Sequence, residues 1–345
     1  MVITLLSAIF VFGLLVLVHE LGHFVTAKLT DMRVDKFAIG FGPKLFSYTR
    51  GETEYSVRIV PLGGFNDIAG MDPEANTAGN RGYCEKSVFA RMFVILGGSA
   101  MNFILPIFLF FGIFFFSGVN TPSTEAVLGT VIEGQPAAEA GLLAGDRILA
   151  VDGQPVGSWT DMTDILKSVQ NKTIDIQYSR ADGAPTTVAV TPIRNEKENR
   201  ALIGVTASMI VEHPGFFESV ELAVSRTVHI VRLMFTMLAE MITGDQSAEL
   251  AGPLGVAQIA GETAQLGFVP LLNLTALLSL NLAIVNLFPI PALDGGHFMM
   301  LVLEAVRGKP LSPKVLNYVQ MIGVGILVLL MLYATSSDVG RIWGK

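Results

Sequence analysis

The sequence predicts a polytopic α-helical membrane protein with four transmembrane helices, a membrane-associated β-hairpin region and one small inserted α+β domain. Of the 345 residues, 51% are hydrophobic and only 15% are charged, whereas soluble domains carry about 25% charged residues. The mean hydropathy is +0.55. Several long apolar segments share the chain with one modest stretch of soluble composition. These observations exclude a large soluble enzyme.

Four apolar stretches approach or exceed the roughly 18 to 20 residues that a membrane-spanning helix needs. The first has no basic segment before it and no small-residue cleavage site after a short apolar core, so we expect a retained helix and no cleaved signal peptide. The predicted spans are Val2–Lys28, Met92–Val119, Phe268–Pro291 and Val315–Tyr333.

Basic residues predict which ends of these helices face the cytoplasm. They recur from Lys28 to Arg91, in the loop between the first two spans, and again at Arg307, Lys309 and Lys314 before the fourth span. We therefore expect a multi-pass protein of the cytoplasmic membrane, with the N-terminus, the insert and the C-terminus on the outer side.

The loop between the first two spans contains a predicted β-hairpin over Gly40–Gly64. Alternating residues in Leu45–Tyr48 and Tyr55–Ile59 flank the turn-forming stretch Arg50-Gly51-Glu52. We expect this hairpin near the membrane surface. A plain connecting hairpin without a further role is the alternative.

The insert after the second span has the composition of a soluble domain. Short β-type runs and one helical stretch are predicted at Val127–Ile132, Arg147–Val151, Trp159–Val169, Ile174–Tyr178 and Thr187–Val190. The stretch Pro136–Ile148 resembles that of PDZ domains in membrane and envelope proteases, which implies binding of an extended peptide or a chain terminus. A small β-rich spacer that binds nothing is the alternative.

Apolar residues recur at helical spacing from Phe217 to Ile242, with charged residues interleaved. This pattern predicts an amphipathic helix, docked on the insert or lying on the outer membrane face, that packs without further function. The predicted organisation is therefore 1–119 for the first two helices and the hairpin, 120–195 for the PDZ-like domain, 196–265 for an amphipathic helical segment, and 266–345 for the last two helices.

The first span carries the sequence His19-Glu20-Leu21-Gly22-His23. In this H-E-x-x-H motif the two imidazoles lie on one face of a helix and can bind one Zn²⁺, while the adjacent Glu20 can take a proton from metal-bound water. Two polar side chains satisfied within a helix bundle are the alternative. Ionisable residues inside a membrane span are costly, and this favours the functional interpretation.

A catalytic zinc usually has three protein ligands, so a third one is needed. The single cysteine, Cys84, excludes a Cys-based zinc site, an iron–sulfur cluster and an internal disulfide. His213 and His229 fall in the external segment, where we expect surface or packing roles.

The stretch Asn286–His297 breaks the third apolar span with two prolines and places Asp294 beside two glycines. Unwound backbone at membrane depth is tolerated only where it is buried in protein or lines a wet cavity. The first helix ends inside, the second leaves and the third returns, so Asp294 reaches the same leaflet as His19 and His23. A helix-terminal acid at the interface is the alternative for Asp294.

Together, the H-E-x-x-H motif, the insert between the second and third helices and the N-x-x-P-x-P-x-L-D-G stretch resemble the site-2 proteases of the bacterial regulator-of-sigma-E type. These are M50 intramembrane zinc metalloproteases, and the resemblance covers essentially the whole chain. Gly40–Pro43 with Pro61–Phe65 also resembles the family's membrane-associated β region.

The resemblance implies a set of functional residues in a bacterial inner-membrane protease. His19, His23 and Asp294 would bind Zn²⁺, Glu20 would be the catalytic base near the cytoplasmic side, and His297 is not carried over as a ligand. The implied substrate-binding residues are Asn286, Pro289 and Pro291. The implied substrates are single-span membrane proteins, such as anti-sigma factors or remnant signal peptides, cleaved within the lipid bilayer.

Two departures from the family and two rival functions remain. The insert has room for one PDZ-like domain where well-known members carry two. The second span begins Gly97-Gly98-Ser99-Ala100-Met101-Asn102 where many relatives resemble Gly-Pro-x-x-Asn, and we expect no functional consequence from this difference. An ion-coupled transporter and a catalytically silent PDZ-bearing receptor are the alternative functions. With a net charge of −7 and no dense basic block, nucleic acid is excluded as a partner.

Overall fold

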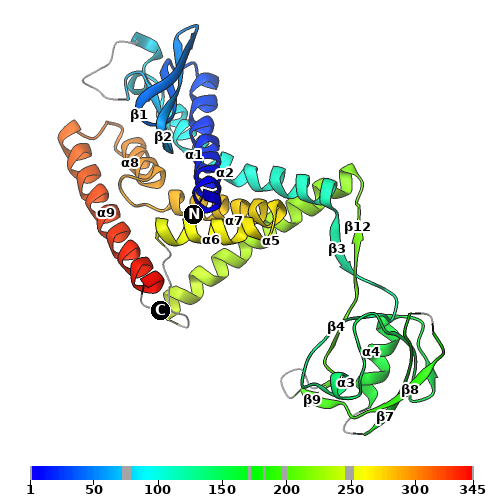
Figure 1. Cartoon of the computed structure of the whole chain (residues 1–345). Helices are drawn as coiled ribbons and strands as arrows, with labels where there is room; N and C mark the ends of the chain where they lie inside the picture. The colour runs from blue at the N-terminus through cyan, green and yellow to red at the C-terminus, as the bar shows by residue number, and fades with distance from the viewer. Residues whose placement is uncertain are drawn as a thin grey trace. The chain divides into compact units, whose positions relative to one another are not determined.

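The structure is a computed structural model that describes residues 2–71, 79–169, 172–181, 183–195, 200–244 and 252–343. The chain divides into two compact units: a helical unit made of Met1–Ser117 and Gly215–Lys345, and an inserted unit made of Gly118–Pro214. Both units are visible in Figure 1, and each is described below by itself.

The helical unit is a bundle in which α2 is central, since it contacts α1, α5, α7 and α8. Its helices are α1 (Val2–Leu29), α2 (Val88–Ser117), α5 (Phe216–Thr243), α6 (Pro253–Gln265), α7 (Phe268–Leu287), α8 (Asp294–Arg307) and α9 (Pro313–Trp343). Two short 3-10 turns, Gly79–Arg81 and Tyr83–Glu85, precede α2.

Five helices among the described residues are long and apolar enough to cross a membrane. Four of them, α1, α2, α7 and α9, coincide with the predicted spans. The fifth is α5, which was predicted to be an amphipathic helix docked on the insert or lying on the outer membrane face. The third predicted span extends too far, because α7 ends at Leu287 and the chain then turns into the separate helix α8.

Helices α1 and α2 approach each other through glycines. A Cβ atom on Gly22 would overlap the backbone of Gly97, and a Cβ atom on Gly97 would overlap the backbone carbonyl of Gly22. Small residues allow such close approach in membranes, where van der Waals packing rather than hydrophobic burial drives helix association. The two glycines therefore set the spacing at which α1 faces α2.

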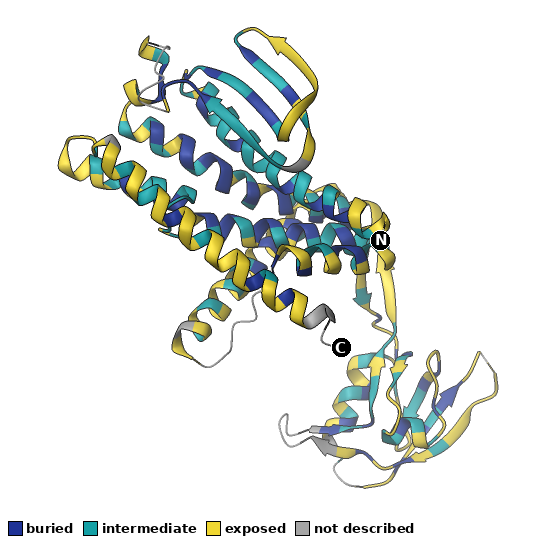
Figure 2. Cartoon of the chain, turned by 60° about the vertical axis from the view of Figure 1, so that its left-hand side comes forward, coloured by how far each residue is buried: buried dark blue, intermediate teal, exposed yellow. Residues whose placement is uncertain are grey.

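The predicted hairpin is formed by β1 (Val34–Arg50) and β2 (Thr53–Ile68), with the turn at Gly51. The part of this sheet around β1 residues 36–39, called its inner end here, is more than a two-stranded hairpin. Residues 36–39 pair with 54–57 on one side and with 64–67 on the other. The inner end is mostly buried or partly buried, whereas every β1 residue from Phe41 to Arg50 is exposed (Figure 2).

Glu52, in the hairpin turn, ties the sheet to the end of α1. Its carboxylate accepts hydrogen bonds from Arg81 at 2.7 and 2.9 Å and from Lys28 at 2.6 Å. These bonds from Arg81 and Lys28 lower the pKa of Glu52 to about 2. The inner end of the sheet is thereby held beside the last turns of α1, where the H-E-x-x-H motif lies.

Helix α5 packs through a face that the apolar pattern does not predict. Ser219, Ala223, Thr227 and Ile230 are buried, and Ala223 and Ile230 share a core with Phe110 of α2. Residues that carry the apolar pattern remain exposed: Phe217, Val220, Val224 and Val228. Small residues let α5 approach α2, and these apolar residues remain exposed.

The inserted unit is built around a four-stranded sheet in the order β6-β5-β7-β8. In that order the strands are Gln154–Pro155, Arg147–Val151, Ile174–Ser179 and Thr186–Val190, and helix α4 is Trp159–Ser168. All of these elements except β6 were predicted, with closely similar bounds. Their apolar side chains form one core that includes Leu128, Leu142, Ile148, Met162 and Ile176.

Further strands in this unit fall partly outside the predicted domain range 120–195. The remaining elements are β3 (Val119–Pro122), β4 (Leu128–Val131), α3 (Pro136–Glu139), β9 (Ile193–Asn195), β10 (Arg200–Leu202), β11 (Val205–Ala207) and β12 (Met209–Glu212). Strands β10, β11 and β12 thus occupy most of residues 200–212, a range predicted to belong to a helical segment. The reason is long-range pairing, since β11 pairs with β4 and β12 with β3.

Candidate metal centre

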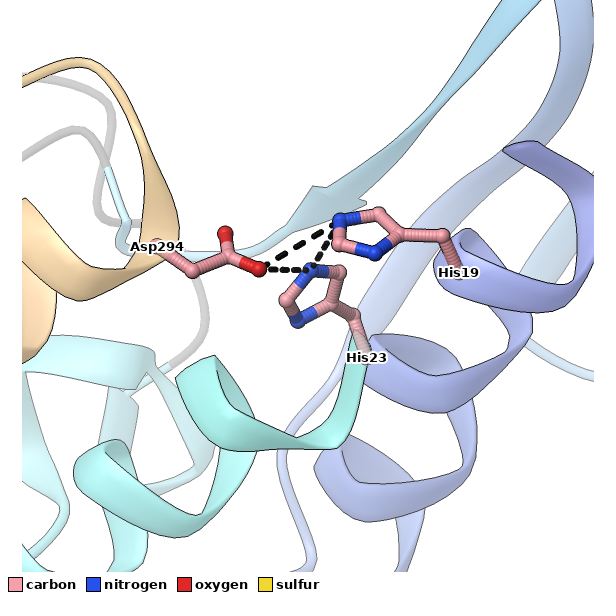
Figure 3. A group of neighbouring side chains, drawn as sticks. All are labelled: His19, His23 and Asp294. Atoms are coloured by element: carbon pink, nitrogen blue, oxygen red, sulfur yellow. Dashed lines mark hydrogen bonds and ion pairs between the residues drawn. The ribbon is translucent and has the colours of Figure 1, made fainter. Parts of the chain in front are cut away.

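The H-E-x-x-H motif lies in the last third of α1, and its two imidazoles face the same side of the helix (Figure 3). The i, i+4 spacing places the rings on successive turns. Their centroids are 4.8 Å apart with the planes at 85°, and the Nε2 atoms of His19 and His23 are 3.2 Å apart. Both Nε2 atoms therefore point at one common position.

Asp294 reaches the same position from the start of α8 (Figure 3). The chain leaves α7 at Leu287 and makes a tight loop, in which Ala292 has a positive φ of 76°. Gly295 and Gly296 then pack directly on this loop, since a Cβ atom on either would overlap loop carbonyl groups. The two glycines after Asp294 therefore allow α8 to begin against the end of α7, with the carboxylate directed towards α1.

The three donor atoms have the spacing of ligands around one tetrahedral ion. Asp294 Oδ2 lies 3.4 Å from His19 Nε2 and 3.5 Å from His23 Nε2. Donors 2.0–2.1 Å from a tetrahedral zinc ion lie roughly 3.3 Å from one another. The His19, His23 and Asp294 side chains are 13%, 12% and 17% exposed. A semi-buried triangle of two imidazoles and one carboxylate fits Zn²⁺ and leaves one tetrahedral position open.

Helix α2 supplies partners for all three side chains. His23 Nδ1 lies 2.9 Å from the carbonyl oxygen of Val94, and His19 Nδ1 lies 3.3 Å from the side-chain amide of Asn102. Ser99 Oγ donates to Asp294 Oδ2 at 3.4 Å. Such outer partners orient metal ligands and fix the tautomer of each imidazole.

The stretch Gly98–Asn102 is a part of the site that was not among the predicted functional residues. A Cβ atom on Gly98 would overlap the imidazoles of His19 and His23, so the glycine makes room for both rings. Asn102 is fully buried. One signal was available in the sequence, because Asn102 is a polar residue within a predicted span, and such residues are functional candidates.

Glu20, the predicted catalytic base, is held by the inner end of the β sheet. Asn66 of β2 donates from Nδ2 to Glu20 Oε2 and to the Glu20 carbonyl oxygen, both at 2.7 Å. Gly64 passes close to the Glu20 side chain, since its Cβ atom would lie 3.2 Å from Glu20 Cγ. The stretch of β2 at residues 64–67 thus runs directly beside the H-E-x-x-H motif.

The predicted substrate-binding residues lie where α7 unwinds. Asn286 is buried in the last turn of α7, Pro289 is exposed in the following loop, and Pro291 is partly buried. The carbonyl of Pro291 packs against Gly323 of α9, whose Cβ atom would overlap it. Pro289 and Pro291 belong to the loop that carries Asp294 into place, and Asn286 lies in the helical turn just before it.

The other histidines are not members of the donor triangle. His213 and His229 are exposed, as expected for surface residues, and His297 is partly buried one turn after Asp294 in α8. Among the described residues, the group whose donor atoms converge consists of His19, His23 and Asp294, with all donor atoms within 4.8 Å of one another.

Comparison with known families identifies the chain. The model of peptidase family M50 matches residues 7–330. The chain belongs to peptidase family M50. The resemblance to site-2 proteases is therefore confirmed, and with it the prediction of a metallopeptidase.

Curated M50 relatives match over nearly their full lengths. The regulator of sigma-W protease RasP of Bacillus subtilis is 32% identical, over 99% of this chain and 99% of its own. The zinc metalloprotease RasP of Bacillus licheniformis is 33% identical, again over 99% of both chains. Among solved structures, the PDZ domain of an SdrC-like protein from Listeria monocytogenes is 26% identical, covering 26% of this chain and 93% of that one, with a TM-score of 0.23.

Proposed function

We propose that this M50 peptidase is a zinc-dependent endopeptidase that cleaves the membrane-spanning segments of single-span membrane proteins. His19, His23 and Asp294 are the ligands of the zinc ion, and Glu20 is the catalytic base. The observation that carries this proposal is the donor triangle, with edges of 3.2, 3.4 and 3.5 Å between atoms from α1 and α8. The Bacillus licheniformis relative, which matches this chain over 99% of its own length, is named a zinc metalloprotease, and this supports the choice of metal.

The residues of the site divide the chemistry between them. When bound, zinc supplies an activated water and polarises the scissile carbonyl. The Glu20 carboxylate accepts the proton of the attacking water and passes it to the leaving amine. Asn66 keeps that carboxylate in one orientation, because its Nδ2 donates at 2.7 Å to Glu20 Oε2 and also at 2.7 Å to the Glu20 backbone carbonyl. Ser99 and the imidazole partners on α2 hold the ligands in place.

The substrate must be locally unwound, because the peptide bonds of a membrane helix are hydrogen-bonded internally. The β2 stretch at residues 64–67 lies at an edge of the sheet, since its pairing among the described residues is with β1 residues 36–39, and it runs beside Glu20. An extended substrate segment can pair with such a strand, as in β-strand addition. Asn286 offers an amide to the freed backbone groups of the substrate. Pro289 and Pro291 contribute no N–H donors to the loop between α7 and α8.

Four spans, rather than five, agree with the geometry of the site. Helix α5 begins beside the C-terminal end of α2, where Phe216 contacts Phe111, and Gly261 of α6 contacts Thr4 at the start of α1. Both positions are at the end of the bundle away from the metal centre. If α5 crossed the membrane, α6 would have to return alone. Its 13 residues reach about 20 Å, which is shorter than the roughly 30 Å hydrocarbon core.

The exposed apolar face of α5 fits this arrangement. A helix that lies in the membrane interface buries its apolar face among lipids, and Phe217, Val220, Val224 and Val228 are exposed on α5. With the basic loops inside, the metal centre then lies near the cytoplasmic side of a bacterial cytoplasmic membrane, and the insert lies outside.

The insert is the proposed peptide-binding module. A groove of about 460 Å³ runs between α4 and the strands β10 and β11, and its lining includes Trp159, Leu166, Ile203 and Val205. An extended peptide or a chain terminus with an apolar side chain fits this groove in the manner of a PDZ ligand. The name of the Bacillus subtilis relative, regulator of sigma-W protease, supports anti-sigma factors as one substrate class, with remnant signal peptides as another.

The experiment that tests the function is cleavage of a model single-span substrate by the purified full-length chain. We expect Glu20→Gln to abolish measurable cleavage and to retain zinc, because Glu20 is not a ligand. Glu221→Gln, a change of the same chemistry on the exposed surface of α5, is the matched control and should cleave normally. Equal cleavage by Glu20→Gln and the wild type would refute the mechanism. Ion flux in proteoliposomes without cleavage would favour a transporter, and peptide binding without cleavage would favour a silent receptor.

A further inference from the structure

We propose that Asn102 is a positioning residue that holds His19 in the one tautomer able to bind the metal. The inference rests on the proposed zinc site. It starts from two observations at the crossing of α1 and α2: the side-chain amide of Asn102 faces His19 Nδ1 at 3.3 Å, and Asn102 is fully buried.

The chemistry of a neutral imidazole makes this contact decisive. A neutral ring carries one hydrogen, so a lone pair at Nε2 for the metal requires the hydrogen to be at Nδ1. An N–H group buried at membrane depth then needs an acceptor. The Asn102 side chain lies at hydrogen-bonding distance from His19 Nδ1, with its amide nitrogen Nδ2 at 3.3 Å, and its oxygen can accept that bond once the amide is turned.

His23 shows the same requirement met in a different way. Its Nδ1 lies 2.9 Å from the Val94 carbonyl oxygen, which can only accept. His23 is therefore fixed with the hydrogen at Nδ1 and the lone pair at Nε2. The partner of His19 is an amide, which can donate or accept, so the tautomer of His19 depends on how the amide is turned.

The orientation of the Asn102 amide decides which of its atoms meets His19. The backbone of Asn102 is fixed, because Ser279 Oγ of α7 donates to its carbonyl oxygen at 2.8 Å. The side chain presents Nδ2 to His19 Nδ1, while Oδ1 is buried and has no hydrogen-bond partner among the described residues. A half-turn of the amide about its Cβ–Cγ bond exchanges these two atoms and lets Oδ1 accept from His19 Nδ1. Metal binding through His19 Nε2 requires this orientation, because Nδ1 then carries the hydrogen.

The experiment measures zinc affinity of the full-length chain by competition with a chromophoric chelator. Asn102→Leu removes the acceptor with little change of volume, and we expect zinc affinity to fall by roughly 10- to 100-fold, as for other outer-sphere partners. Asn102→Asp restores an acceptor, and we expect affinity within a few-fold of the wild type. Ser279→Ala is the matched control, because it removes a hydrogen bond to the Asn102 backbone but leaves the amide. It should keep wild-type affinity.

A second readout is the visible absorption of the cobalt-substituted chain, which reports the electronic properties of the ligands. Asn102→Asp should shift the cobalt band, since a carboxylate makes the imidazole more basic than an amide does, and Ser279→Ala should not. If Asn102→Leu does not fold, the Asn102→Asp spectrum decides: an unchanged band overturns the inference.

Wild-type zinc affinity in folded Asn102→Leu, or equal losses in Asn102→Leu and Asn102→Asp, would also overturn it while leaving the proposed function intact. A wild-type chain that binds no zinc would instead refute the proposed metal site, and the role of Asn102 with it.

Discussion

Replacing Gly98 by alanine tests whether α2 shapes the metal centre. The added Cβ atom would lie 2.7 Å from His19 Cε1 and 2.8 Å from His23 Cε1, whereas ordinary carbon contacts are about 3.5–4.0 Å. The imidazoles, or α2 itself, must therefore move by at least about 0.7 Å. Metal sites tolerate ligand distances within about 0.2 Å. We expect zinc affinity to fall at least about 100-fold, which corresponds to about 2.8 kcal/mol.

The assay is zinc competition and thermal unfolding of the purified chain, with Gly112→Ala as the matched control. Gly112 also lies within α2, and a Cβ atom there would meet no heavy atom within 4 Å. The control should keep wild-type zinc affinity, and its helix should gain up to about 1 kcal/mol from the higher helix propensity of alanine. Wild-type zinc affinity in folded Gly98→Ala would refute the view that this glycine makes room for the rings.

Three further predictions concern side chains around the site and in the insert. Arg91→Met breaks a buried ion pair between α2 and α8 and should lower unfolding stability by about 3–5 kcal/mol in thermal denaturation. Asn66→Leu should lower kcat about 10- to 100-fold with little change in KM, because Glu20 loses a charge-assisted hydrogen bond; an altered KM alone would contradict this.

In the insert, burial acts to raise the pKa of Asp146, but the hydrogen bonds from Arg180 and a backbone N–H outweigh it and lower the pKa. Because the folded-state pKa is lowered, the stability contributed by this pair is present above the ordinary aspartate pKa of about 3.9 and is lost as the pH falls through the folded-state value. Hydrogen exchange of the insert against pH checks this, and equal acid sensitivity in Asp146→Asn would contradict it.

The chemistry of the site could be predicted from the sequence because its motifs are local. The spacing of His19 and His23 fixes both imidazoles on one helix face whatever the rest of the chain does. Asp294 lies far away in sequence. It was placed near the two histidines by counting the membrane crossings between them and by family resemblance. The strands β4, β5, β7 and β8 of the insert were also predictable, because short alternating runs bounded by turn residues carry their own signal.

Features that depend on two elements at once could not be predicted in this way. The role of Gly98 follows from its short distance to imidazoles on another helix. The sequence of α2 by itself gives no information on that distance. Helix α5 is a second example. Its apolar periodicity is real, but in a membrane the apolar residues can face lipid while the small residues Ser219 and Ala223 face protein.

The same reasoning explains why α2, which donates no metal ligand, is central to the site. A polar group at membrane depth is costly unless it has a partner. The Val94 carbonyl, Asn102 and Ser99 supply one each to His23, His19 and Asp294, and the glycines Gly97 and Gly98 bring these partners close enough to act. In the proposed site the ligands therefore come from α1 and α8 and α2 orients them, so changes along the site-facing side of α2 should alter metal affinity before they alter the fold.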